Sequence, residues 1–520
     1  MYWADKVAKE IIDSKKFKPY WVDDMFTPSG FAHIGSLRGP LVHDLIYKAL
    51  KYAKEEVTFS FVINDFDPID GLPEDLKDEF SKYLGIPVRV APSPKEGYES
   101  FADYFASDFK KVLEGLGVIP KFYSSWDLYH EGKFDKAIKI ALDNAEKIQD
   151  IYQKVSGSQK REKGWLPLQV ICQSCGKLGT TRVHDWDGET VEYTCEKEMV
   201  KWAKGCGITA RISPFGGNGK LPWKVDWPAH WQVLGVTIEG AGKDHSSAGG
   251  SRDIARELVK EVFYLEEPYN LPYEFFLIGG KKMASSKGLG LKAKDASELL
   301  PLSVVRFLFC RTDYKQSVEF DPVETMAIPD LFDEYDRCYK SFIESSDETL
   351  SRTFEMSQIG ELPKREPTFL PRFRDVVNYV QQPNINVSDK FKEIKGVSLS
   401  ENEENILRER EKYAKIWVEK YAPKELNFQM SPLVPDNLKL DLEQKDFLLA
   451  AVSLVEKELG ADELQLELYN LTKEKKIPAK KAFAAIYRVF LGKEYGPKAG
   501  AFLTSYPTKK VIERFKDAAK

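Results

Sequence analysis

Cysteine is scarce in this chain, and its scarcity excludes a disulfide-stapled secreted fold. Only 6 of the 520 residues are cysteine, whereas small secreted domains that lack a sufficient core are dense in disulfides. Four of the six lie within 35 residues, and Cys310 and Cys338 stand apart, as buried small side chains commonly do. We therefore expect reduced thiols and a cytoplasmic protein.

Long apolar runs are also absent. No stretch approaches the ~20 apolar residues that a membrane-spanning helix needs. Residues 1–21 follow an amphipathic helix pattern that contains acids, without the apolar core of an export signal. The sequence therefore predicts no membrane contact and no targeting segment.

The chain has no strong excess of either charge, because 76 Lys and Arg face 81 Asp and Glu and the net charge is −5. This balance provides no global attraction to nucleic acid, although local basic surfaces remain possible. Repeats and long low-complexity tracts are missing as well. A chain of 520 residues is too long for one core, so we expect three or four domains.

The first informative stretch is TPSGFAHIG, residues 27–35. It lies between a predicted strand near 19–23 and a predicted helix over 37–53, and a second strand over 57–64 completes a βαβ unit. This pattern is typical of a parallel sheet, in which ligands bind outside the carboxyl ends of the strands. His33 falls at the strand-to-helix turn, where helix N-termini favour phosphate.

A second stretch, GKKMASSKG at residues 280–288, follows the apolar run FFLIGG. Either stretch alone is a weak signal. Together they predict two halves of one ATP site, with His33 at the α-phosphate and Lys282 and Lys287 at the outer phosphates. The alternatives are a buried capping histidine and a solvated charged loop.

The stretch EGAGKDH at residues 239–245 lies between these two signatures. Its glycines and acid suit recognition of ribose and adenine. His245 is a candidate for an amino-acid pocket, and the alternative is a hydrogen-bonded core histidine.

The four clustered cysteines are Cys172, Cys175, Cys195 and Cys206. A C-x-x-C pair followed by two later thiolates suits one tetrahedral Zn²⁺, and a glycine follows Cys175 and Cys206 as knuckle turns require. The alternatives are an incomplete site or His184 in place of one cysteine. Four thiolates leave no open position, so we expect a structural role.

Several stretches together resemble class I lysyl-tRNA synthetases, the type found mainly in archaea and some bacteria. The similar pieces are WAD at 3–5, TPSGFAHIG at 27–35, LPWKVDWPAHW at 221–231, GKDH at 242–245, KKMASSKG at 281–288, VVRFLFCR at 304–311 and YRVFLGKEYGPKAGAFL at 487–503. The first signature corresponds to the family's HIGH motif and the second to its KMSKS motif. The resemblance covers most of the chain.

The resemblance implies an α/β fold: a Rossmann-type parallel-sheet catalytic domain with a zinc-bearing insertion, followed by a C-terminal α-helical anticodon-binding domain. The corresponding boundaries are 1–85 and 216–290 for the two catalytic halves, 86–215 for the insertion, 291–340 for a linking domain and 341–520 for the anticodon-binding domain. The implied activity is ATP- and Mg²⁺-dependent charging of tRNA(Lys) with L-lysine by a monomer.

The resemblance also implies roles for individual residues. The catalytic set is His33, Ser36, Lys282 and Lys287. The ATP-binding set is Pro28, Ser29, Gly30, Gly35, Gly242, Asp244, Met283, Ser285 and Ser286. The lysine-binding set is Thr27, Trp223, Asp226, His245 and Tyr273, because an ammonium needs an anionic or aromatic partner. Each pocket residue, the tryptophans above all, could instead pack in the core.

The sequence departs from the family in three places. Ser36 replaces a usual Asn, and Asp24 and Met25 stand where relatives have a small Ser-Gly pair. Residues 93–104 contain no Cys or His, so we predict that a metal site found there in relatives is absent.

Basic runs in the C-terminal region predict contact with RNA. The lysines are Lys473, Lys475, Lys476, Lys480, Lys481 and those of 509–520, and the neighbouring rings are Phe483, Tyr487 and Phe490. Exposed rings would suit unstacked anticodon bases. The alternative is a solvated helix face over a core.

Three other functions remain to be distinguished. A glutamyl-type class I synthetase would need a cationic anchor, which the aromatic and acidic stretch 223–231 does not favour. An adenylyl transferase without tRNA would leave the helical C-terminal half unexplained. A catalytically silent zinc-bearing RNA-binding module would not need His33, Lys282 and Lys287.

Overall fold

The computed structural model describes residues 1–158, 164–282, 291–382, 385–428, 434–435 and 438–520. The chain divides into two compact units. The first unit comprises 1–320 and 338–364, and the second unit comprises 321–337 and 365–520. The predicted boundaries of a separate insertion and linking domain stay predictions.

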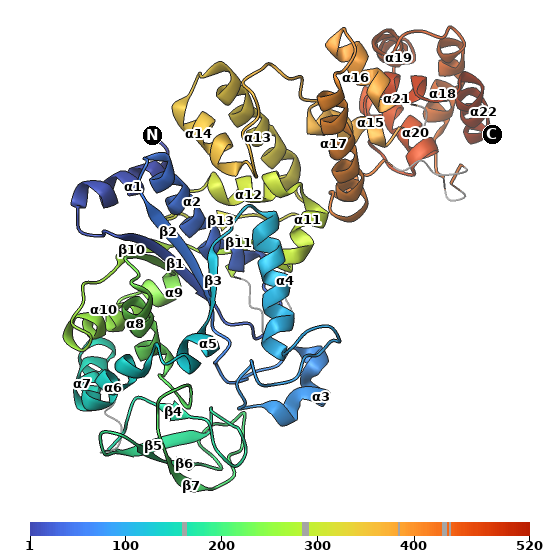
Figure 1. Cartoon of the computed structure of the whole chain (residues 1–520). Helices are drawn as coiled ribbons and strands as arrows, with labels where there is room; N and C mark the ends of the chain where they lie inside the picture. Colours follow the sequence, from blue (N-terminus) through green and yellow to red (C-terminus); the bar gives the residue numbers. More distant parts are fainter. Residues whose placement is uncertain (159–163, 283–290, 383–384, 429–433, 436–437) are drawn as a thin grey trace. The chain divides into compact units, whose positions relative to one another are not determined.

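A five-stranded parallel sheet forms the centre of the first unit (Figure 1). Its strands are β1 (Tyr20–Phe26), β2 (Val57–Ile63), β3 (Lys121–Ser124), β9 (Ile238–Gly242) and β10 (Tyr269–Tyr273). In the order β10-β9-β1-β2-β3, the strands β2 and β3 lie on one side of β1, and β9 and β10 lie on its other side. The sheet therefore has a topological switch point between β1 and β9, where open α/β sheets bind ligands.

The helices of the first unit follow the predicted periodicity. They include α1 (Trp3–Ser14), α2 (Arg38–Tyr52), α4 (Phe101–Gly115), α6 (Asp135–Asp143), α7 (Ala145–Ser156), α8 (Trp223–Leu234) and α10 (Ser251–Glu261). In α4, Ser100 caps the first turn by accepting a hydrogen bond from the Asp103 N–H at 3.1 Å. Its phenylalanines 101, 105 and 109 recur every four residues and are buried, which is the spacing of one helix face.

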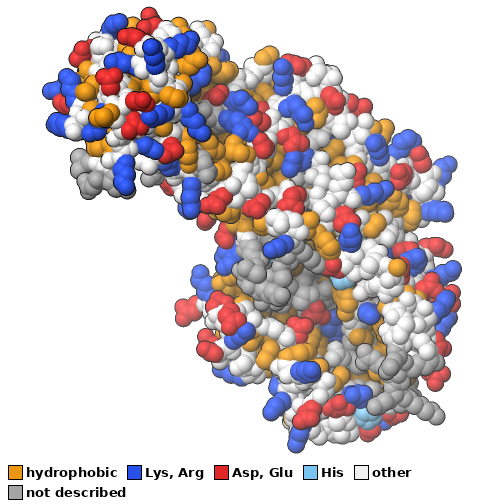
Figure 2. All heavy atoms as spheres, turned by 180° about the vertical axis from the view of Figure 1, so that it is seen from behind, with side chains coloured by type: hydrophobic (Ala, Val, Ile, Leu, Met, Phe, Trp, Pro, Cys, Tyr) orange, Lys and Arg blue, Asp and Glu red, His pale blue; other side chains and the backbone are white. Residues whose placement is uncertain are grey.

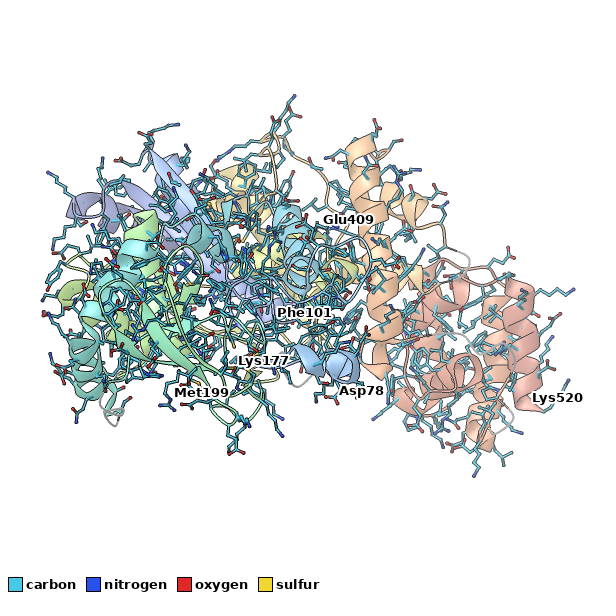
Figure 3. The ribbon with its side chains drawn as sticks, turned by 60° about the horizontal axis from the view of Figure 1, so that its bottom comes forward. Asp78, Phe101, Lys177, Met199, Glu409 and Lys520 are labelled. Carbon is cyan, nitrogen blue, oxygen red and sulfur yellow. The ribbon has the colours of Figure 1, made fainter. Side chains whose placement is uncertain are left out.

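Short antiparallel strands interrupt this α/β pattern, as predicted for the cysteine segment. They are β5 (Thr181–Trp186), β6 (Val191–Cys195) and β7 (Thr209–Ile212) in one sheet, and β4 (Gln169–Val170) with β8 (Gly219–Lys220) in another. Lys177 and Met199 belong to this segment, and Phe101 lies at the start of α4 (Figure 3).

The run FFLIGG does not continue the main sheet, contrary to expectation. β11 (Phe276–Ile278) instead pairs with β12 (Lys281–Lys282) and β13 (Val318–Glu319) in a separate sheet. The edge of the main sheet is β10, whose Pro272 has no N–H to donate and is tolerated only where no further strand pairs. Hydrophobic patterning predicts a strand but does not say which sheet the strand joins.

Two polar segments, 345–370 and 383–402, contain the helices α14 (Glu348–Ser357) and α16 (Val387–Lys395). Asp347 caps α14 by accepting from the Leu350 N–H at 2.8 Å, and Asn386 caps α16 in the same way. Both segments form helices despite their polar composition, because each helix has a capped first turn. Each also buries one phenylalanine, Phe354 in α14 and Phe391 in α16.

The second unit is helical within its described part, as predicted for 403–520. It contains α15 (Phe373–Val380), α17 (Glu401–Lys420), α18 (Leu442–Val455), α19 (Ala461–Glu474), α20 (Ala479–Leu491), α21 (Ala499–Thr504) and α22 (Thr508–Ala519). Of the two readings of the C-terminal rings, core packing is confirmed for Tyr487 and Phe490, which are 8% and 1% exposed and belong to the core. Their spacing on α20 places them on its inward face.

The remaining features agree with the composition. Among the described helices, none is long and apolar enough to cross a bilayer. Acidic and basic side chains are interspersed on the face drawn in Figure 2. Cys310 and Cys338 are both buried, as predicted.

Candidate active site and cysteine cluster

The first signature leaves the carboxyl end of β1 and enters a short 3₁₀ helix over Ile34–Leu37. His33 caps this helix, and its Nδ1 accepts a hydrogen bond from the Ser36 N–H at 3.1 Å. The neutral ring therefore carries its proton on Nε2, because Nδ1 is the acceptor. Capping and phosphate binding are thus compatible roles for the two nitrogens of one side chain.

The segment that follows the second signature pairs with the first one. The Ile34 N–H donates to the Leu291 carbonyl at 2.9 Å, and the Ala293 N–H donates to the Ala32 carbonyl at 2.8 Å. His33 and Lys292 form the antiparallel bridge between them. Segments about 260 residues apart are therefore joined at the switch point.

The lysine loop itself is only partly described. Lys282 ends β12, and Met283, Ser285, Ser286 and Lys287 lie outside the described residues. The loop is nevertheless anchored on its far side by the hydrogen bonds of Leu291 and Ala293 to the first signature.

Aromatic rings gather where β9 ends. Gly242 closes this strand, and Asp244 and His245 lie in the following turn α9 (Lys243–Ser246). The His245 ring lies 5.9 Å from each of the rings of Trp223 and Trp227, centroid to centroid, and these two indoles stack at 5.3 Å. The structure thus brings together two predicted pocket residues, Trp223 and His245, from α8 and α9.

Tyr273 ends β10 beside Gly242. A Cβ added to Gly242 would lie 3.5 Å from Cε2 of the Tyr273 ring. Burial is the largest cause of the raised pKa of Tyr273, and the nearby carboxyl groups of Asp24 and Glu239 raise it further. Its hydroxyl is therefore a protonated donor near neutral pH.

Asp226 and Thr27 belong to a buried polar chain that the sequence did not predict. Thr27 donates to Asp67 at 2.9 Å, and the Lys220 ammonium lies 2.9 Å from Asp67 Oδ1 and 3.0 Å from Asp226 Oδ2. Tyr129 donates to the other oxygen of Asp226, which is 0% exposed. The carboxylate of Asp226 is thus already paired with an ammonium of the chain.

The protonation of Lys220 follows from these neighbours. Burial lowers the pKa of Lys220, but the carboxylates of Asp226 and Asp67 outweigh burial and the net direction is upward. Lys220 therefore stays charged although it is only 3% exposed, as a buried cation does when it is paired on two sides.

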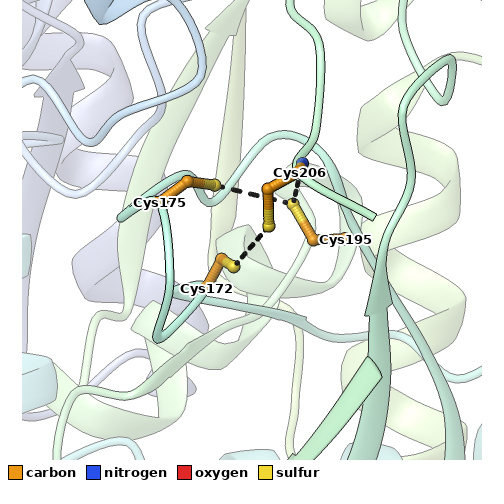
Figure 4. Close-up of side chains that lie close together, drawn as sticks. All are labelled: Cys172, Cys175, Cys195 and Cys206. Atoms are coloured by element: carbon orange, nitrogen blue, oxygen red, sulfur yellow. Dashed lines mark hydrogen bonds between the residues drawn. The ribbon is translucent and has the colours of Figure 1, made fainter. Parts of the chain in front are cut away.

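All four predicted cysteine ligands converge in the inserted segment (Figure 4). Their sulfur atoms all lie within 4.8 Å of one another, with 3.6 Å between Cys172 and Cys206 and 3.7 Å between Cys175 and Cys195. Sulfurs bound to one tetrahedral Zn²⁺ at ~2.3 Å lie about 3.8 Å apart. His184 instead lies 3.6 Å from the Glu192 carboxylate and is not a member of the group.

Backbone turns position these thiols as a zinc knuckle requires. Gly176 and Gly207 follow two of the cysteines and have φ of +71° and +88°, in the region that favours glycine. The Cys206 N–H donates to Cys195 Sγ at 3.3 Å, and the Ile208 N–H lowers the pKa of the Cys206 thiol to about 7. The cluster could therefore hold a metal ion, by its geometry and by its donor set.

The family comparison agrees with this geometry. The family model described as tRNA synthetases class I (K) matches residues 1–360, well over half of the chain. The chain belongs to the class I (K) tRNA synthetases.

Full-length relatives of this class I synthetase are similar along the whole chain. It is 32% identical over 521 residues to a lysine–tRNA ligase of Archaeoglobus fulgidus, with 100% of both chains covered. It is 34% identical over 539 residues to a lysine–tRNA ligase of Methanocaldococcus jannaschii, with 99% of both covered. A solved glutamate tRNA ligase from Elizabethkingia meningosepticum aligns over 96% of this chain and 99% of that one, at 11% identity and a TM-score of 0.44, too distant to bear on substrate.

Sequence reasoning missed two buried charged residues of this synthetase, Glu239 and Lys220. Glu239 accepts hydrogen bonds from the indole N–H groups of Trp227, at 2.9 Å, and Trp231, and burial raises the pKa of Glu239 to about 7. Lys220 lies one residue before the tryptophan-rich stretch, but a lone lysine is ordinarily a surface residue. No sequence signal identified Glu239 or Lys220, because the residues that pair with them lie on other helices, strands or loops.

Proposed function

We propose that the chain activates L-lysine with ATP to form lysyl-adenylate and transfers the lysyl group to the 3′ end of tRNA(Lys). Membership of the class I (K) synthetases supports this activity. The observation that carries it is the hydrogen-bonded pairing of Ala32–Ile34 with Leu291–Ala293, because this pairing joins the first signature to the segment that follows the second.

The first step needs positioning and charge stabilisation rather than a protein nucleophile. The lysine carboxylate attacks the α-phosphorus, the bond to the bridging oxygen breaks, and pyrophosphate leaves. His33 Nε2–H would donate to the α-phosphate, while Lys282 and Lys287 would neutralise the outer phosphates. Mg²⁺ on the triphosphate supplies further neutralisation. Each positioned donor is worth about 3–4 kcal/mol in the transition state, by analogy with oxyanion donors.

The amino acid would lie between the aromatic cluster and the ends of β1 and β10. Trp223 and His245 form one wall, and Tyr273 lies across β9 from β1. Thr27 follows β1 and is held by Asp67. This arrangement suits a substrate whose carboxylate faces the α-phosphate and whose side chain extends back along β1.

We assign one structural Zn²⁺ to the four thiolates. Four sulfur ligands complete a tetrahedral shell and leave no position for substrate. Binding would staple the short strands β5–β7 to the C-x-x-C turn. Contact of this insertion with the acceptor arm of the tRNA is proposed from the family resemblance.

Recognition of the anticodon is assigned to the helical second unit. Lys473, Lys476 and Lys480 lie near the turn between α19 and α20, whereas Lys475 and Lys481 already pair with acids, Lys481 at 2.8 Å from Asp441. Tyr469, on α19, is 45% exposed and is a better stacking ring than the buried Phe490.

A glutamyl-type synthetase is the alternative, and the described charges disfavour it. A glutamate side chain needs an uncompensated cation. Lys220 is neutralised by two carboxylates, and Arg252, 1% exposed, pairs with Glu267 at 3.0 Å. Both cations are therefore already paired, and neither is available to a glutamate side chain.

Amino-acid-dependent ATP–pyrophosphate exchange tests the proposal. We would measure exchange with each of the twenty amino acids, with and without tRNA. Exchange with lysine alone is the expected result. Exchange with glutamate or arginine would identify another class I synthetase, and no exchange with any amino acid would contradict an aminoacylating enzyme.

A further inference from the structure

Acidic side chains surround the switch point, and nearly all of them are already engaged. Both oxygens of Glu239 accept indole N–H groups, and both oxygens of Asp226 have partners. Asp67 is held by Thr27 and Lys220. Asp23 Oδ1 accepts from the Ser60 hydroxyl, while its Oδ2 is buried without a hydrogen-bond partner in the described part of the chain and Asp23 adjoins the buried Glu239. These carboxylates therefore serve the fold.

Asp24 differs from Glu239, Asp226 and Asp67 in having an unpartnered oxygen, and from Asp23 in lying beside Tyr273. It lies on β1, is 7% exposed, and its Oδ2 is buried with no hydrogen-bond partner in the described part of the chain. Its Oδ1 accepts only the neighbouring Met25 N–H, at 2.9 Å. A buried carboxylate oxygen without a donor costs free energy unless a ligand supplies one.

The nearest basic group does not supply that donor. His43 Nδ1 lies 3.4 Å from Asp24 Oδ2, but it also lies 2.8 Å from the Gly39 carbonyl. Its Nε2 accepts the Gly240 N–H at 2.7 Å, so the ring proton lies on Nδ1, towards Gly39. Burial lowers the pKa of His43, but Asp24 outweighs burial and the net direction is upward. Arg38, next to Gly39, donates to backbone carbonyls of the segment 309–316 instead. Asp24 Oδ2 thus lies against His43 but has no hydrogen-bond donor in the described part of the chain.

A glycine lets the backbone of α2 approach this carboxylate closely. A Cβ at Gly39 would lie 2.8 Å from Asp24 Oδ2 and 2.8 Å from the Tyr273 hydroxyl. Both are closer than any ordinary carbon contact. Because Gly39 has no side chain, the carboxylate and the hydroxyl can both border the start of α2.

The position of Asp24 along β1 suits the far end of a long substrate. Thr27, at the phosphate end, lies three residues further on, about 10 Å along an extended strand. Lysine has a flexible four-carbon stem that ends in an ammonium with three donors. Such a stem reaches from a carboxylate near the α-phosphate towards Asp24.

We propose that Asp24 is the anion that receives the ε-ammonium of the substrate lysine, with the Tyr273 hydroxyl beside it, and that Gly39 allows α2 to pack against these two groups without displacing them. The assignment rests on the proposed function and deepens it, because it names the residue that selects lysine. Asp226, which the sequence favoured for this role, instead binds the chain's own Lys220.

The test is lysine-dependent exchange by the full-length Asp24→Asn variant. The KM for lysine should rise about 30-fold or more, since removal of one partner of a desolvated charge pair has an effect of that order. The KM for ATP should change less than about 3-fold, as expected of a loss confined to one substrate. L-norleucine has the lysine stem without the ammonium, so the preference for lysine over norleucine should fall by a similar factor.

Two further variants separate this role from a structural one. Asp44→Asn removes another buried carboxylate of the same region, which pairs with Arg306; it should lower the melting temperature and leave the lysine-to-norleucine preference unchanged. Gly39→Ala keeps Asp24 but crowds it, and should raise the KM for lysine about 10-fold or more. If Asp24→Asn fails to fold, the Gly39→Ala variant decides whether Asp24 binds lysine. The KM of this variant for lysine should rise, and lysine should no longer raise its melting temperature.

The outcomes distinguish this inference from the function itself. Lysine-dependent exchange in the wild type, with the KM for lysine within 2-fold of wild type in both Asp24→Asn and Gly39→Ala, overturns the role of Asp24 and leaves the function standing. Absence of lysine-dependent exchange in the wild type overturns both.

Discussion

Replacement of Lys220 by methionine is the sharpest test of the buried charges around the crevice. The Lys220 ammonium lies 2.9 Å from Asp67 and 3.0 Å from Asp226, and the residue is 3% exposed. Lys220→Met fills most of the same volume but leaves two buried carboxylates facing each other without a cation. Breaking a buried pair in this way costs about 3–5 kcal/mol.

The expected result is a clear loss of thermal stability. At about 2–4 °C per kcal/mol for a large domain, the melting temperature should fall by roughly 6–12 °C. Circular dichroism or scanning fluorimetry measures this shift. The deficit should be smaller at pH 5 than at pH 8, because the stranded carboxylates take up protons more readily at lower pH.

An exposed lysine provides the matched control. Lys9 pairs with Asp13 at 2.6 Å, and both side chains are 61% exposed. Lys9→Met should change the melting temperature by no more than about 1–2 °C, since surface pairs contribute about 0–1 kcal/mol. A Lys220→Met protein as stable as this control would refute the network. So would an effect on the KM for lysine with no loss of stability, because Asp226 would then be available to the substrate.

Three further predictions follow from the site. His33→Ala should lower the rate of lysine-dependent exchange at least tenfold. The melting temperature should fall by no more than about 2 °C, because the loss of one helix cap has an effect of that size. An unchanged exchange rate would remove His33 from the ATP site. Metal analysis should find one zinc per chain, and Cys172→Ser should lose zinc and unfold the insertion, as limited proteolysis would show; a zinc-free wild type would contradict the cluster. Burial raises the pKa of Glu239 from 4.5 to about 7, so the folded state holds more protons there, and stability should fall as pH rises from about 4.5 to about 7; Glu239→Gln should flatten this part of the profile, and an unchanged profile would argue against it.

Local patterns were enough to predict the elements that carry the site. The alternation of apolar residues over 57–64 and the turn residues before His33 predicted β2 and the β1-to-α2 connection. The cysteine spacing and its two glycines predicted the knuckle, and the positive φ of Gly176 and Gly207 confirms the turns. Such features depend on residues within a few positions of one another, so the sequence displays them directly.

The errors came where a segment's partner lies elsewhere in the chain. The pattern of FFLIGG predicts a strand, but hydrogen bonds to β12 and β13 placed it outside the main sheet. For the rings of Tyr487 and Phe490 the sequence left stacking on RNA open beside core packing, and packing with α21 and α22 decided for the core. Polar composition did not prevent α14, because a cap and one buried face suffice.

By itself the sequence determined the family, the βαβ nucleus, the two signature stretches and the four clustered thiols, since each is written in residue type and short spacing. Tertiary structure decided which buried charges neutralise one another. It paired Asp226 with Lys220, six residues away but on a different element, and left Asp24 Oδ2, beside Gly39 and Tyr273, with no hydrogen-bond donor among the described residues. The reason is that Coulomb energy depends on distance through space and on desolvation, neither of which can be read from position along the chain.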